Sequence, residues 1–195
     1  MLEKMSNFAP NKCEMLMITE KDILQFKAFA RQDGALLALL WVCAFLLYIV
    51  GLSNSMLALA ALMLVCYTPL FVGKRVGKYR DTVLDGVISY RRAYGYTVLM
   101  FYYGSILFAV AQYVYFAFLD QGFLLSRFTD MVSSDEGRQV LQRYGMVETM
   151  NESLRQMALT RPIDFALNML IANVAAGLVL GIPVASIRAR RVKSE

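Results

Sequence analysis

The stretch Arg80–Leu119 decides the fold of this chain: RDTVLDGVISYRRAYGYTVLMFYYGSILFAVAQYVYFAFL. Its last 26 residues, 94–119, contain no Asp, Glu, Lys or Arg. A helix of that length rises about 39 Å, which is enough to cross a hydrocarbon core of about 30 Å with some tilt. Arg91 and Arg92 stand immediately before it. The stretch therefore predicts a transmembrane helix that enters the bilayer from a basic side.

Three more apolar runs accompany this one, over residues 34–51, 56–73 and 163–187. The whole chain is 58% hydrophobic and 18% charged, whereas a soluble domain carries about 25% charged residues. We therefore expect an all-α, polytopic membrane protein with four transmembrane helices, forming one membrane domain over residues 1–195.

The segments outside these runs also carry helical patterns. Residues 19–33 predict a short amphipathic juxtamembrane helix that lies on the lipid headgroups. Residues 80–92 predict a basic interfacial helix, since their apolar residues recur at helical spacing. Residues 120–162 predict a small helical cap between the third and fourth spans, and residues 188–195 form a basic tail.

The distribution of basic residues predicts the orientation. Of the 20 Lys and Arg residues, fifteen lie before the first span, between spans two and three, or in the tail, and five lie in residues 120–162. Because Lys and Arg mark the cytoplasmic side, both termini should be cytoplasmic and residues 120–162 extracytoplasmic. The net charge of +5 is thus read as a positive-inside bias, and no nucleic-acid partner is expected.

Few side chains suited to catalysis are present. The chain has no His, and its three Cys residues offer no disulfide framework. We expect no enzymatic activity, no catalytic residues, no cofactor and no metal site. The four spans hold no ionisable residue between their charged ends, which argues against a proton-coupled transporter or a voltage sensor.

Three groups of residues remain as candidates for contacts. A basic group could meet lipid headgroups, although positive-inside bias alone also explains it: Lys74, Arg75, Lys78, Arg80, Arg91 and Arg92. An interhelical hydrogen bond is expected from Gln112 to Asn168 or Asn173. Gly177, Gly181 and Ala185 form a small-residue stripe suited to helix packing, within the chain by default or between two copies.

The chain resembles the bacterial membrane family known as domain of unknown function 4199. The resembling stretches are KYRDTVLDGVISYRRAYGYTVLMFYYGSILFAVAQYVYFAFLD (78–120), GMVETMNESLRQ (145–156), and the last span with Asn173, Gly177 and its basic tail. The resemblance covers the chain from about residue 17 onward. It implies a four-helix protein of the inner membrane of a Gram-negative bacterium, and it brings no activity and no catalytic residues.

Two classes of function follow. The first is a non-enzymatic membrane subunit or scaffold of an envelope complex, with a membrane-protein partner or a second copy of the chain. The second is a lipid- or polyprenyl-phosphate-handling protein, such as a carrier, a flippase-like unit or a glycosyltransferase accessory. Membrane lipids are partners in both.

Overall fold

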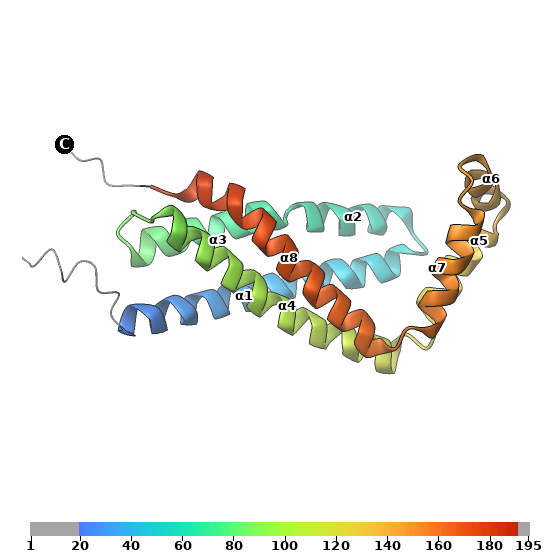
Figure 1. Cartoon of the computed structure of the whole chain (residues 1–195), viewed down its shortest axis with the longest axis horizontal. Coiled ribbons are helices and arrows are strands. Elements are labelled where there is room, and N and C mark those ends of the chain that lie inside the picture. Colours follow the sequence, from blue (N-terminus) through green and yellow to red (C-terminus); the bar gives the residue numbers. More distant parts are fainter. Residues whose placement is uncertain (1–19, 191–195) are drawn as a thin grey trace, which may run out of the picture.

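The computed structural model describes residues 20–190, and this part of the chain is almost entirely helical (Figure 1). The elements are, in order, α1 (Glu20–Gly51), α2 (Ser55–Cys66), α3 (Thr68–Val83), α4 (Tyr90–Val114), a π-helical turn η2 (Tyr115–Leu119), α5 (Phe123–Ser133), α6 (Asp135–Arg143), α7 (Val147–Leu159) and α8 (Pro162–Arg188).

Four stretches in the described residues are long and apolar enough to cross a membrane: Asp22–Gly51, Ser55–Val83, Tyr90–Leu119 and Pro162–Arg188. They agree with the expected all-α fold with four transmembrane helices, and they fit a multi-pass membrane protein. The first two are longer than the predicted runs 34–51 and 56–73, because each continues into a charged segment.

The helix α4 lies at the centre of the bundle and packs against α1 and α8. Glycine allows the close approach of α1, since a Cβ built at Gly34 would lie 2.8 Å from Tyr103 Cβ. Further along the same contact, Trp41 of α1 packs against Phe101 and Phe108 of α4, with ring centroids 5.5 and 5.7 Å apart. The two helices are therefore in close backbone contact at Gly34, and aromatic side chains fill the space between them near Trp41.

The separate juxtamembrane helix expected over 19–33 is not formed. Instead α1 continues from Glu20 to Gly51 without a break. No proline or turn interrupts this sequence, and Asp33, which was expected to end the amphipathic part, is buried against α3 and α4. Because Asp33 is paired inside the bundle, it can lie within a continuous helix and does not mark a helix boundary at the membrane surface.

The basic helix expected over 80–92 is also wrong. Arg80 belongs to the last turn of α3, the chain leaves the helix after Val83, and α4 begins at Tyr90. The turn between them contains Asp85 and Gly86 at φ values of +49° and +85°. Such angles favour glycine and tolerate aspartate, so the Asp–Gly pair breaks the helix.

The second span is divided between α2 and α3 at Tyr67, and Pro69 stands in the first turn of α3. Proline is accepted there because the first turn of a helix has unpaired N–H groups in any case. Trp41 of α1 stabilises this break, since its Nε1 donates a hydrogen bond of 3.2 Å to Thr68 Oγ1.

The segment 120–162 forms a three-helix cap, α5–α7, at the end of the bundle where α4 ends and α8 begins (Figure 1). Gln121 and Gly122 have positive φ values and turn the chain out of α4. Asp120 then caps α5, because its carboxylate accepts from the N–H groups of Gly122 and Leu124 at 3.1 and 3.2 Å. We call the opposite end, where α1 begins, α3 meets α4 and α8 ends, the basic end.

Candidate functional site: a buried ion pair at the basic end

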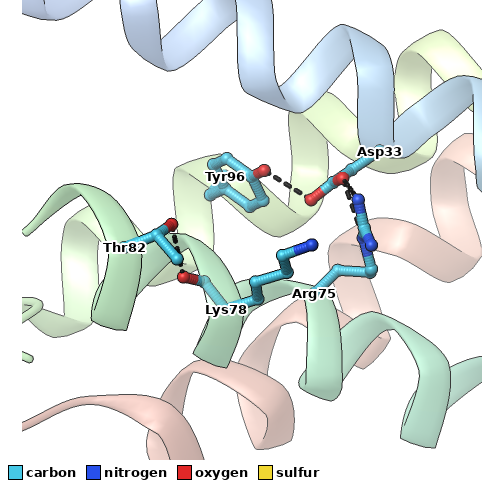
Figure 2. A network of polar contacts seen from close by, with 5 residues as sticks. All are labelled: Asp33, Arg75, Lys78, Thr82 and Tyr96. Atoms are coloured by element: carbon cyan, nitrogen blue, oxygen red, sulfur yellow. Dashed lines mark hydrogen bonds and ion pairs between the residues drawn. The ribbon is translucent and has the colours of Figure 1, made fainter.

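Three helices meet at one carboxylate near the basic end (Figure 2). Asp33 of α1 is only 4% exposed. Its Oδ1 accepts from Arg75 of α3, at 2.8 Å from Nε and also from Nη2. Its Oδ2 accepts a hydrogen bond of 2.6 Å from the hydroxyl of Tyr96 of α4. Both carboxylate oxygens are therefore satisfied, each by a different helix. We call Asp33, Arg75 and Tyr96 the polar centre.

Aromatic rings surround the polar centre. The Tyr96 ring stacks on that of Tyr79, with centroids 4.4 Å apart and planes 17° apart. Phe26 of α1 meets both rings edge-on, at 5.6 and 5.9 Å. The Arg92 guanidinium lies over Phe26 and reaches the Tyr79 hydroxyl at 3.5 Å. The site thus combines a charge pair with a set of packed aromatic rings.

The geometry gives the polar centre a structural role. A buried charge is costly unless it is paired and hydrogen-bonded, and Asp33 meets both conditions through α3 and α4. Breaking such a pair from one side costs about 3–5 kcal/mol. Figure 2 shows the Lys78 side chain extending toward the same region from α3. This adds positive charge around the carboxylate.

Residues 32–190 match the family described as protein of unknown function (DUF4199). The chain belongs to the DUF4199 family. No curated protein and no solved structure matches it.

The DUF4199 match includes all three residues of the polar centre and the whole cap. Sequence reasoning missed the centre, because Asp33 stands just before the apolar run 34–51 and was assigned to the membrane surface. A signal was present, however. Arg75 follows the second apolar run just as Asp33 precedes the first, and two antiparallel helices bring those two ends together.

The predicted basic group does not form one surface in this DUF4199 protein. Arg75 pairs with Asp33, and Arg80 pairs with Asp81 at 2.7 Å. Lys74 donates to the Tyr67 hydroxyl at 3.1 Å, and Arg92 donates to Tyr79. Lys78 and Arg91 are exposed. The structure thus uses Arg75 and Arg80 to connect parts of the fold and leaves Lys78 and Arg91 at the surface.

The hydrogen bond expected from Gln112 to Asn168 or Asn173 is not formed. Gln112 Oε1 and Asn173 Nδ2 are both buried without a partner in the described structure, and Asn168 is exposed. The offset of α8 along α4 explains this. Gly177 lies against Phe101, so Asn173 lies about two turns short of Gln112 along α4.

The small-residue stripe faces α4. A Cβ built at Gly177 would lie 2.5 Å from Phe101 Cβ, and one built at Gly181 would lie 3.0 Å from Tyr94 Cε2. Ala185 is fully buried. Within this chain the stripe is therefore occupied by intramolecular packing, which leaves none of its three residues facing a second copy.

Proposed function

We propose that this DUF4199 protein is a non-enzymatic membrane scaffold, whose four spans hold the cap at the membrane surface for an envelope protein. One observation carries the proposal: the charged residues inside the bundle join its helices, while the cap stands apart from the bundle and keeps apolar side chains exposed. The first feature makes a rigid support, and the second offers a contact surface.

The polar centre supports the rigid part of this proposal. Asp33, Arg75 and Tyr96 come from three different helices, and every polar atom of the carboxylate is engaged. A transported proton or ion would need a group that can release its partner, and here both oxygens are held. In residues 20–190 no group of three or more His, Cys, Asp or Glu side chains could hold a metal ion.

The cap supports the contact part. The substantial contacts of α5, α6 and α7 are with one another. Large apolar side chains remain open to solvent on them, among them Leu159 at 76%, Tyr144 at 70% and Val140 at 55% exposure. Exposed apolar surface can mark a site of protein interaction, and tyrosine is enriched among the residues that contribute most to binding.

The lipid-handling alternative has weaker support. A carrier of a lipid or polyprenyl phosphate would need several free basic groups in one track. Arg75 and Arg80 are both engaged in ion pairs, so the expected track from Lys74 to Arg92 is interrupted.

The proposed orientation places the basic end in the cytoplasm and the cap outside the inner membrane of a Gram-negative bacterium. The arrangement of the helices supports this, because α1 begins, α3 meets α4 and α8 ends at the same end of the bundle (Figure 1). Arg75 pairs there with Asp33 of α1, and Arg188 of α8 lies over Gly73 and Gly77 of α3. Basic residues gathered at one end are typical of the cytoplasmic face.

Photo-crosslinking from the cap tests the scaffold. We would replace Tyr144 by p-benzoylphenylalanine, and we would use Tyr102, a 45% exposed residue of α4, as the matched position within the membrane. We expect a discrete protein adduct from Tyr144 in intact cells, with the same protein held at fixed stoichiometry in native mass spectrometry. No protein adduct from a folded Tyr144 variant, or the same adduct from Tyr102, would contradict the proposal.

A further inference from the structure

A cationic site forms at the basic end where α8 crosses α3. The Arg188 side chain lies over two glycines of α3. A Cβ built at Gly73 would be 3.4 Å from Arg188 Nε, and one at Gly77 would be 3.6 Å from Nη1. The absence of side chains at these two positions lets the guanidinium rest directly on the helix. Two glycines four residues apart usually let a second helix pack closely against them. Here the space beside them is filled by a charged side chain instead.

An acid close to this group, Asp81, is already paired with another arginine. Asp81 receives Arg80 at both of its oxygens, from Nε at 2.7 Å and from Nη2 at 3.0 Å. The remaining nitrogen of Arg80, Nη1, donates to the Arg188 carbonyl at 3.3 Å. Arg188 and Arg190 interact with Asp81 only through longer-range electrostatics and form no ion pair among the described residues. One acid beside three arginines leaves the site with excess positive charge.

The site is held in place by the backbone. Ile88, in the turn between α3 and α4, and Arg190, after α8, exchange two hydrogen bonds, of 3.1 and 3.0 Å between N and O. Ile88 is almost fully buried. This clamp fixes the end of α8 against the turn, so Arg188 and Arg190 are positioned before any ligand arrives.

The site stands at the level of lipid headgroups. Gly73 comes 18 residues after Ser55, the first residue of that span, which is about 27 Å along the helices and close to the hydrocarbon thickness of about 30 Å. Exposed apolar residues stand next to this site along the chain, since Leu70 lies one turn before Gly73 and is 64% exposed, and Ile187 precedes Arg188 and is 75% exposed. Cations beside exposed apolar side chains match the phosphate and the acyl chains of a phospholipid.

We propose that Arg188 and Arg190 bind the phosphate of an anionic phospholipid headgroup at the seam between α3 and α8. The proposal does not depend on the scaffold, because it concerns the end of the bundle opposite the cap. It also differs from the basic group expected from the sequence, since both arginines belong to the end of α8 and only folding brings them to Gly73 and Gly77.

Lipid titration of the purified full chain tests this site. Bound phosphatidylglycerol and phosphatidylcholine with the same acyl chains would be counted by native mass spectrometry. We expect a clear preference for phosphatidylglycerol, and Arg188→Gln and Arg190→Gln should each weaken it about fivefold, as expected for one charge near an anionic headgroup. Arg31→Gln is the matched control, since Arg31 is an exposed arginine of α1 at the same end but away from the α3–α8 seam, and it should leave the affinity unchanged.

The proposal would be overturned by equal binding of both lipids, by unchanged binding in both α8 variants, or by an equal loss with Arg31→Gln. Inorganic phosphate would be added as a competitor. Its displacement of phosphatidylglycerol, with the same dependence on Arg188, would assign the site to a soluble phosphate and overturn the lipid. Arg190→Gln is the variant that should keep the fold, because the hydrogen bonds between Arg190 and Ile88 are made by the backbone and do not depend on the side chain.

Discussion

At the scale of single residues, Asp33 is the most consequential side chain in the bundle. It lies 18 residues before Gly51, the end of α1, which is about 27 Å along the helix and near the edge of the hydrocarbon on the basic side. An ionised carboxylate at that depth is tolerated only with partners. Arg75 and Tyr96 are those partners, and they tie α3 and α4 to α1.

Asp33→Asn should therefore destabilise the protein. The substitution keeps the shape of the side chain but leaves Arg75 without its counter-charge, and we expect a loss of about 3 kcal/mol in the free energy of unfolding. This value is at the low end because the Arg75 side chain keeps 21% of its surface exposed. Titration of the folded protein with sodium dodecyl sulfate in mixed micelles would measure the loss.

Asp164→Asn provides the matched control. Asp164 also pairs with an arginine, Arg161, at 2.9 Å, but this pair is exposed, so its removal should have no measurable effect on unfolding. The paired replacement Asp33→Leu with Arg75→Met should be less damaging than Asp33→Asn, since it removes both charges. Equal stability of Asp33→Asn and Asp164→Asn would contradict a structural role for the polar centre.

At the scale of elements, the seam between α4 and α8 depends on glycine. Gly177 lets the backbone of α8 approach the Phe101 side chain, and this contact fixes the offset of the two helices. The same offset keeps Asn173 away from Gln112 and leaves their buried polar atoms without partners. Close packing is thus achieved here at the expense of an interhelical hydrogen bond.

Gly177→Ala should weaken this seam. The new methyl would lie 2.5 Å from Phe101 Cβ, and overpacking of this kind costs about 1–3 kcal/mol. Gly95→Ala is the matched control, because its methyl would meet only Phe26 Cζ, at the ordinary distance of 3.8 Å. It should be neutral or slightly stabilising through helix propensity. Thermal unfolding in detergent compares the two, and a Gly177→Ala protein as stable as Gly95→Ala would refute the contact.

At the scale of the whole molecule, the sequence was sufficient to predict the four spans, but it did not predict the start of α1, the end of α3 or the polar centre. The uncharged stretch 94–119 predicts a span without further information, because length and apolar character alone decide whether a helix crosses the bilayer. The end of α3 could not be placed in the same way. Asp85–Gly86 is a turn signal, but the apolar residues Val83, Leu84, Val87 and Ile88 imitate a helix across it.

Sequence reasoning missed the polar centre and the α3–α8 seam for a different reason. Asp33 and Arg75 stand 42 positions apart, and Arg80 contacts the Arg188 carbonyl across 108 positions. A charge at the end of an apolar run has the same local pattern whether it faces water or a partner on another helix. Only the arrangement of the helices distinguishes the two cases.

The central claim is that the basic end faces the cytoplasm and the cap faces outward. Single cysteines at Ser153 in the cap and Thr82 near the end of α3, both exposed, would be introduced after replacing Cys13, Cys43 and Cys66. Labelling of spheroplasts with a membrane-impermeant maleimide tests the orientation most directly. The account predicts that Ser153→Cys is labelled at once and Thr82→Cys only after permeabilisation, and the reverse pattern would contradict it.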